Sequence, residues 1–196
     1  PIVILKEFTP SSILKAIKKE KVTSSVLAPL LIPALANSPD ASKYDHSSLR
    51  HIVAGGAPTS SEGFKQAIKV FGNIFAAAYA AAEITPITSL SPEEMTFEGP
   101  ESVKASSCGK EVPNAEVRIV DEQDNDAALG QLGEVIVIGK HMMAGYWKAS
   151  KATEAAIKGG YFYTGDLGKM DEEGYLYLAG RKKDVITSQG KLISPS

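Results

Sequence analysis

The chain has 196 residues, of which 43% are hydrophobic, and this length and composition suit one large or two small folding units. Its formal net charge is -2, from 21 basic and 23 acidic residues, so no sequence-wide field attracts nucleic acid or an anionic membrane. The single Cys108 excludes an internal disulfide, and His46, His51 and His141 lack the spacing of metal ligands, which favours structural or solvent-exposed roles for them.

Targeting signals are absent from the sequence. No run of about 18 apolar residues occurs, and the N-terminus lacks a basic segment followed by an apolar one, so neither a transmembrane helix nor a signal peptide is predicted. We therefore expect a cytoplasmic protein. The chain opens at Pro1 without methionine and stops at Ser196 directly after a basic segment, which leads us to expect a piece of a longer protein.

The first half of the chain is typical of alternating strands and helices. Thr9 and Pro10 form an N-cap and first-turn pair that opens a helix. Gly55 and Gly56 end a buried strand and turn into a helix that is capped near residues 59–60. In chain order, strands are expected at residues 2–5, 22–27, 49–54 and 74–79. Helices are expected after Pro10, from a start bracketed by Pro29 and Pro33 to an end before Asn37, and after Gly56. Strands separated by helices predict a parallel sheet with right-handed crossovers.

From about Lys110 the pattern changes to strands and turns. Strands are expected at residues 115–121, 133–139 and 175–179, with a polar turn at 122–126 and a helix around 150–158. This pattern predicts a small antiparallel unit. The expected fold class is therefore α/β, with a parallel α/β subdomain at 1–108 and a small antiparallel β-barrel-like subdomain at 109–180. Residues 181–196 would lead towards a further part of the protein.

The stretch from Tyr163 to Pro195 carries the strongest chemical signal. It contains Tyr-Thr-Gly-Asp-Leu at 163–167, Asp-Glu-Glu-Gly-Tyr-Leu-Tyr at 171–177 and Gly-Arg-Lys-Lys-Asp-Val-Ile at 180–186. A carboxylate such as Asp166, placed after a tight turn, can accept both hydroxyls of a ribose, and Arg181 can donate to the same sugar or to a phosphate. Gly165 and Gly180 permit the turns that fix these side chains. Either triplet alone is more often a surface turn, whereas the order of the whole stretch indicates a nucleotide site.

Further motifs follow in a fixed order. They are His-Ile-Val-Ala-Gly-Gly-Ala-Pro at 51–58, Tyr-Ala-Ala-Ala-Glu at 79–83, a Gly-Lys-Glu-Val-Pro segment opening 109–121, Gly-Glu-Val-Ile-Val-Ile-Gly at 133–139 and Met-Ala-Gly-Tyr-Trp at 143–147. With these motifs the chain resembles, over essentially its whole length, the adenylate-forming superfamily of acyl-CoA synthetases, aryl-CoA ligases, luciferases and peptide-synthetase adenylation domains. The resemblance implies an ATP-dependent acyl-CoA synthetase that converts a carboxylic acid to acyl-AMP and pyrophosphate and then transfers the acyl group to CoA. ATP, Mg²⁺ and CoA would be its cofactors, and a carboxylic acid its substrate.

The resemblance also assigns roles to residues. The turn of Gly55, Gly56, Ala57 and Pro58 would line the acyl pocket and approach the adenine, the Tyr79 ring would pack on the base, and Ala80 and Ala82 would take nucleotide-binding positions. Asp166 and Arg181 would hold the ribose, and Glu83 would bind Mg²⁺ as a catalytic residue. Lys183 would be the hinge of a C-terminal lid, and Gly190 would let the chain approach the pantetheine arm of CoA. Residues 181–196 then become the hinge and the start of the lid.

The sequence departs from the family pattern beside Tyr79. Ala80 replaces the usual glycine, and Ala82 replaces a threonine whose hydroxyl would donate to the α-phosphate. A hydrogen bond to a charged group is worth about 1.5–3 kcal/mol, so either turnover is slow or a neighbour such as Thr85 compensates. The Ser/Thr/Gly-rich phosphate loop ending in Pro-Lys-Gly, and the lid with its lysine, do not occur in the 196 residues. We expect them before Pro1 and after Ser196, and we expect the isolated chain to be inactive.

Several alternatives stay open at the level of sequence. Glu134 fits a cap on a barrel turn better than a substrate contact, and Tyr146 with Trp147 fits a core aromatic pair, although Tyr146 could also shape the pocket wall. The Arg-Lys-Lys-Asp-Val-Ile run favours the acyl-CoA synthetase form. A carrier-protein-loading adenylation enzyme and a non-catalytic nucleotide-binding fragment are the alternatives, and medium-chain, long-chain and aryl acids are all possible substrates.

Overall fold

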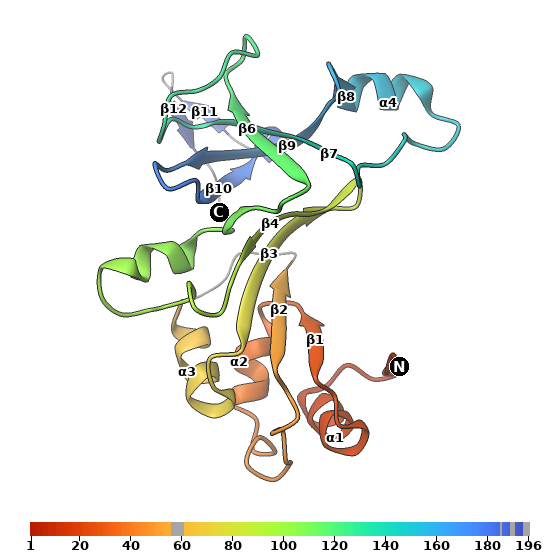
Figure 1. Cartoon of the computed structure of the whole chain (residues 1–196), viewed down its shortest axis with the longest axis vertical. Coiled ribbons are helices and arrows are strands. Elements are labelled where there is room, and N and C mark those ends of the chain that lie inside the picture. The colour runs from red at the N-terminus through yellow and green to blue at the C-terminus, as the bar shows by residue number, and fades with distance from the viewer. Residues whose placement is uncertain (56–60, 185, 189–190, 194–196) are drawn as a thin grey trace. The chain divides into compact units, whose positions relative to one another are not determined.

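The computed structural model describes residues 1–55, 61–184, 186–188 and 191–193. The chain forms two compact units, of which the first comprises Pro1–Ala78 with Leu90–Ser106 and the second comprises Tyr79–Ser89 with Ser107–Ser196 (Figure 1). The expected α/β fold class is confirmed, because a sheet with parallel pairs is followed along the chain by an antiparallel sheet. No helix within the described residues has the length and apolarity to cross a membrane.

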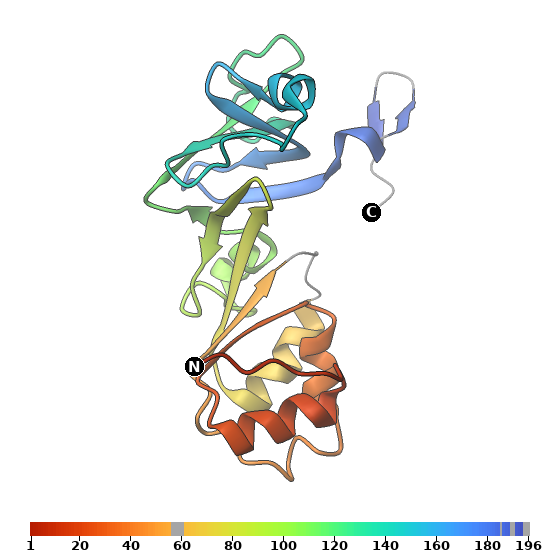
Figure 2. The same cartoon turned by 90° about the vertical axis from the view of Figure 1, so that its right-hand side faces the viewer.

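The first unit is built on parallel strands with helices between them. Strands β1 (Ser24–Leu27) and β2 (His51–Gly55) pair in parallel, as do β2 and the first residues of β3 (Phe75–Ala81). The connecting helices are α2 (Leu31–Ala36) and α3 (Ser61–Phe71), and α1 (Pro10–Glu20) precedes β1. Figure 2 shows the three helices gathered beside one another. The predicted parallel order of this half is confirmed.

Local chemistry explains where α1 begins and ends. The Thr9 hydroxyl accepts a hydrogen bond from the Ser12 backbone N–H, and the Ser12 hydroxyl oxygen accepts one from the Thr9 backbone N–H. Pro10 starts the first turn of the helix. Lys21 closes the helix in the left-handed region with φ 51°. The predicted N-cap is thus confirmed, whereas the cap expected for α3 at residues 59–60 lies outside the described residues.

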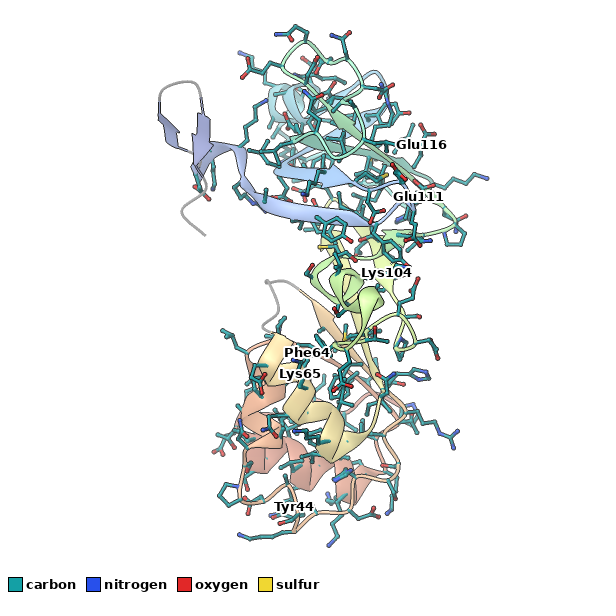
Figure 3. The ribbon with its side chains drawn as sticks, turned by 90° about the vertical axis from the view of Figure 1, so that its left-hand side faces the viewer. Tyr44, Phe64, Lys65, Lys104, Glu111 and Glu116 are labelled. Atoms are coloured by element: carbon teal, nitrogen blue, oxygen red, sulfur yellow. The ribbon has the colours of Figure 1, made fainter. Side chains whose placement is uncertain are left out.

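The core of the first unit combines many aliphatic side chains with the rings of Phe64 and Phe75. Phe64 of α3, labelled in Figure 3, is buried and meets Phe75 edge-to-face with 5.5 Å between ring centroids. Phe97, in the segment that leads to the 3-10 helix η1 (Pro100–Ser106), also contacts Phe64, with 6.2 Å between ring centroids. The strand expected at residues 2–5 is wrong. Ile2 and Ile4 are 91% and 87% exposed, and among the described residues no strand pairs with this segment, so its backbone lacks the partner that a strand needs.

The second unit is an antiparallel sheet in the order β10-β9-β7-β6. Its strands are β6 (Ala115–Val120), β7 (Gly133–Gly139), β9 (Tyr161–Met170) and β10 (Leu176–Arg181), and the short β8 (Ile157–Lys158) pairs with β9 after helix α4 (Ser150–Ala156). Strand β4 (Ile84–Leu90) pairs antiparallel with β5 (Lys110–Glu111). Helix η2 (Lys182–Asp184) follows β10 and precedes the pair β11 (Ile186–Ser188) and β12 (Lys191–Ile193). The predicted strands β6, β7 and β10 and the predicted helix α4 are confirmed.

Strand β4 and the first half of strand β9 were not predicted, nor were the short strands β5, β8, β11 and β12. Strand β4 contains Pro86, which normally argues against a central strand. Strand β9 contains the Thr-Gly-Asp motif that predicts a tight turn, yet these residues run inside a ten-residue strand. Strands β4 and β9 both contribute to the apolar core of the second unit. Its buried members are Tyr79, Ile84, Ile87, Val117, Ile119, Val135, Val137, Phe162 and Leu176.

Candidate functional site

The site begins with an irregularity where β9 pairs with β7. Glu134 lies opposite Leu167 and Ile136 lies opposite Tyr163, so residues 164–166 of β9 face the single residue Val135. Such a bulge leaves backbone groups without ladder partners. Gly165 has φ 71°, a value that a glycine adopts without the strain of a Cβ atom. The motif that the sequence predicts as a turn is therefore a bulge that redirects Asp166.

Side chains satisfy the backbone groups that the bulge leaves open. The Thr164 hydroxyl donates to the Val135 carbonyl oxygen at 2.7 Å and accepts the Asp166 N–H at 3.0 Å. Glu134 Oε1 accepts the Gly165 N–H at 3.2 Å. Both Thr164 and Glu134 are buried. The bulge is thus held by defined hydrogen bonds, and this is a reason for the fixed direction of the Asp166 side chain.

Asp166 joins two of the residues that the sequence singles out. Its carboxylate accepts the Tyr79 hydroxyl at 2.6 Å and Arg181 Nε at 2.8 Å, and residues 181 and 166 are direct partners in the pairing of β10 with β9. Asp166 is 8% exposed. Burial, together with the hydrogen bond to Asp166, raises the pKa of the Tyr79 phenol, so the phenol stays a hydrogen-bond donor. The fold therefore brings Tyr79, Asp166 and Arg181 together.

A second ion pair lies next to the first. Lys182 Nζ donates to Glu134 Oε2 at 2.7 Å, and this hydrogen bond raises the pKa of the Lys182 ammonium group. Lys183 follows in η2 and is exposed. An open cavity of about 330 Å³ is lined by Gly165, Arg181, Lys182 and Lys183. The predicted ribose residue Arg181 and the predicted hinge residue Lys183 therefore line one cavity.

Glu83 lies in the two-residue turn between β3 and β4, where a loop from β7 to α4 holds it. Its carboxylate accepts the Tyr146 hydroxyl at 2.6 Å, and its carbonyl oxygen accepts the Met143 N–H at 2.7 Å. The Thr153 hydroxyl oxygen accepts the Tyr146 N–H at 2.9 Å and ties this loop to α4. The hydrogen bond to Glu83, followed by burial, raises the pKa of the Tyr146 phenol.

The expected core pair of Tyr146 and Trp147 is wrong. Tyr146 is 37% exposed and turns its hydroxyl to Glu83, while Trp147 is 87% exposed. Two consecutive aromatic residues predict burial, but Tyr146 and Trp147 lie on a loop rather than on a face of a sheet. Glu134 also differs from its expected place, because it lies in β7 and holds a bulge rather than a turn.

A Mg²⁺ ion would find one predicted ligand in Glu83. Among the described residues no group of three or more His, Cys, Asp and Glu side chains could hold a metal ion. Mg²⁺ is commonly bound by one or two carboxylates together with substrate phosphates and water, so a half-buried carboxylate in a turn suits it when a nucleotide supplies the other oxygens. The three histidines were predicted to be structural or solvent-exposed, and in the structure His46 meets the Phe71 ring edge-on at 4.8 Å while His51 is exposed. His141 Nε2 makes a 2.7 Å hydrogen-bond contact with the Pro86 carbonyl oxygen.

The remaining predicted site residues are spread over both units. Gly55 ends β2 in the first unit, whereas Ala80 and Ala82 are exposed beside Glu83 in the second. Gly56, Ala57, Pro58 and Gly190 lie outside the described residues. The sequence did not predict that Thr164 and Glu134 hold the bulge that presents Asp166, or that Tyr146 donates to Glu83. The Gly-Glu pair that opens β7 and the threonine before Gly165 were visible signals, but only strand pairing brings them together.

Comparison with known proteins agrees with these motifs. Residues 1–147 match the sequence model of a family described as AMP-binding enzyme. The chain is 33% identical over 184 residues to a long-chain-fatty-acid–CoA ligase of Salmonella typhimurium, covering 94% of this chain and 32% of that protein. It is 35% identical over 199 residues to 4-coumarate–CoA ligase 1 of Glycine max, covering 100% of this chain and 67% of that protein.

A solved structure shares the fold. The amide bond synthetase McbA of Marinactinospora thermotolerans superposes with a TM-score of 0.87 at 32% sequence identity, covering 96% of this chain and 38% of that one. The chain therefore spans about a third of the length of the fatty-acid relative and of this solved structure.

Proposed function

This chain belongs to the AMP-binding enzyme family, and we propose that it supplies the ribose-binding half of the site in an ATP-dependent ligase that adenylates a carboxylic acid and passes the acyl group to CoA. The observation that carries the proposal is the buried Asp166 carboxylate, which the β9 bulge presents beside Arg181 and Tyr79. The identities of the similar proteins as CoA ligases support the class of reaction.

The proposed chemistry of Asp166 is recognition of the ribose hydroxyls. A carboxylate accepts hydrogen bonds only, and its four lone-pair positions leave room for two sugar hydroxyls beside the bonds from Tyr79 and Arg181. Bonds to a charged acceptor are stronger than neutral ones, and a mostly buried acceptor strengthens them further. Arg181, whose side chain is 56% exposed, keeps free donor groups for the sugar or the α-phosphate.

The other proposed roles follow the family pattern. Tyr79 would pack on the adenine, Gly55 with residues 56–58 would approach it, Ala80 and Ala82 would border the nucleotide, and Glu83 would hold Mg²⁺. A carboxylate oxygen of the substrate attacks the α-phosphate, so these residues act mainly by positioning and by balancing charge. Lys183 would be the hinge of a lid domain and Gly190 would approach CoA.

The acceptor of the acyl group is the least constrained part of the proposal. CoA is favoured by the similarity to CoA ligases, whereas the similarity to an amide bond synthetase supports an amine as the second candidate. Adenylation is the first step in either case. Loading of a carrier protein and a non-catalytic nucleotide-binding role stay as alternatives. The cytoplasmic location expected from the sequence also stays a prediction.

The ribose assignment is tested by nucleotide binding to the 196-residue chain. Calorimetric titration with AMP should show binding that Asp166→Asn weakens at least tenfold, because two charge-assisted bonds become bonds to a neutral amide. Asp126→Asn is the matched control, since Asp126 pairs with Arg118 at 2.7 Å on β6, outside the candidate site. Equal AMP affinity in Asp166→Asn and the unsubstituted chain would refute the assignment.

A second assay separates binding from catalysis. The 196-residue chain should not catalyse exchange between ATP and pyrophosphate in the presence of fatty or aryl acids, because the phosphate loop and the lid lysine of the family do not occur in its sequence. Acid-dependent exchange by the chain alone would contradict this expectation. AMP binding without exchange would support a half-site that needs the rest of an enzyme.

A further inference from the structure

Glu134 is a buried carboxylate that no step of the proposed reaction uses. Its side chain is 10% exposed and comes from β7, the strand next to the bulge. A buried charge loses its hydration and is tolerated where donors replace the lost water. Glu134 has two such donors, the Gly165 N–H on Oε1 and the Lys182 ammonium group on Oε2. One carboxylate thus touches both segments that lead to the ribose residues.

The first donor belongs to the bulge. Residues 164–166 face the single residue Val135 across the ladder, and the Gly165 N–H donates to the Glu134 side chain. Gly165 directly precedes Asp166. A shift of the Gly165 peptide plane would therefore turn the Asp166 side chain away from Tyr79 and Arg181 and from the proposed position of the ribose.

The second donor belongs to the segment after β10. Arg181 and Lys182 are consecutive, and each is paired with a carboxylate of which about a tenth is exposed: Arg181 with Asp166, and Lys182 with Glu134. The four charges balance. If Glu134 were neutral, Lys182 would lose this ion pair, which ties the residue next to Arg181 to β7.

We propose that Glu134 is a positioning residue for ribose recognition: it fixes the Gly165 bulge that presents Asp166 and, through Lys182, holds the residue next to Arg181, without touching the nucleotide itself. The assignment rests on the proposed function, because it presupposes that Asp166 binds a ribose. It differs from a purely structural role, which would affect every ligand of the chain alike.

The test compares adenosine with 2′,3′-dideoxyadenosine, which lacks both ribose hydroxyls. Dissociation constants of the two ligands are measured by NMR titration of the 196-residue chain. The dissociation constant of dideoxyadenosine divided by that of adenosine isolates what the ribose hydroxyls contribute to binding. Glu134→Gln should lower this ratio by roughly three- to tenfold while leaving dideoxyadenosine binding unchanged, because only the orientation of Asp166 is altered.

Glu116→Gln is the matched control. Glu116 lies on β6 of the same unit, is exposed, and accepts the Tyr161 hydroxyl at 2.5 Å; Figure 3 labels it. Its substitution should leave the ratio unchanged. If Glu134→Gln fails to fold, Lys182→Gln replaces it, since that side chain is 56% exposed and its loss should also lower the ratio through the unpaired Glu134.

Two results would overturn the assignment. An unchanged ratio in Glu134→Gln, or in Lys182→Gln when that variant is the one measured, would show that ribose recognition does not depend on Glu134. A proportional loss of affinity for both ligands with a lowered melting temperature would show a structural role only. If the unsubstituted chain itself does not distinguish the two ligands, the ribose assignment of Asp166 falls, and the positioning role of Glu134 falls with it.

Discussion

The hydrogen bond between Tyr79 and Asp166 makes a prediction about stability as well as binding. The donor and acceptor atoms are 2.6 Å apart, and both residues are 8% exposed. Asp166→Ala removes the acceptor of a buried hydroxyl, which costs about 1.5–3 kcal/mol for a bond to a charged group. The pair with Arg181 adds only about 0–1 kcal/mol, because the Arg181 side chain is 56% exposed and water screens it. The expected loss in the free energy of unfolding is therefore about 1.5–4 kcal/mol.

A double-mutant cycle isolates the Tyr79–Asp166 bond from the rest of this loss. Tyr79→Phe keeps the ring in the apolar core and removes only the hydroxyl. In the Asp166→Ala background this hydroxyl has already lost its charged acceptor, so its removal should cost less than in the unsubstituted chain. The coupling energy between the two substitutions should be about 1–2 kcal/mol.

The assay must report on the second unit alone, because a chain with two compact units need not unfold in one step. Hydrogen exchange of peptides from β9, followed by mass spectrometry, gives the local opening free energy of that strand. The four proteins of the cycle are compared at one pH. Additive effects, with a coupling energy below about 0.5 kcal/mol, would show that the Tyr79 hydroxyl and the Asp166 carboxylate do not share a bond in solution.

Three further predictions concern other residues. Tyr146→Phe should reduce the ratio of MgATP to metal-free ATP affinity by roughly three- to tenfold, because the hydroxyl that orients Glu83 is lost, whereas Tyr161→Phe should not change that ratio; equal behaviour of the two variants would contradict the role of Tyr146. Burial raises the pKa of the Cys108 thiol to about 11, so alkylation at pH 9 should be roughly fifty- to a hundredfold slower in the folded chain than in urea, and similar rates would refute this. In an enzyme that performs both half-reactions, Lys183→Pro should suppress one of them and spare the other, whereas a proportional loss of both with a lower melting temperature would speak against a hinge.

Local features of the sequence were enough to predict much of the fold. Thr9 and Pro10 predict the start of α1 because capping depends on neighbours within one turn. The parallel order of β1, β2 and β3 follows from helices between strands, since such crossovers have few alternatives. The failure at residues 2–5 has the same physical basis. An apolar run becomes a strand only where a partner completes its hydrogen bonds, and no local pattern reports that partner.

The candidate site also has features that the sequence predicts and features that depend on the tertiary structure. The sequence by itself determined which residues could recognise a nucleotide, because an acceptor such as Asp166 and a planar donor such as Arg181 carry that chemistry in their side chains. Only the tertiary structure decided how they are held. The bulge of β9 comes from its register against β7, so the bonds of Glu134 to Gly165 and of Tyr79 to Asp166 join residues 31 and 87 positions apart. Register is set by how whole strands bury their apolar faces, and no short motif contains that information.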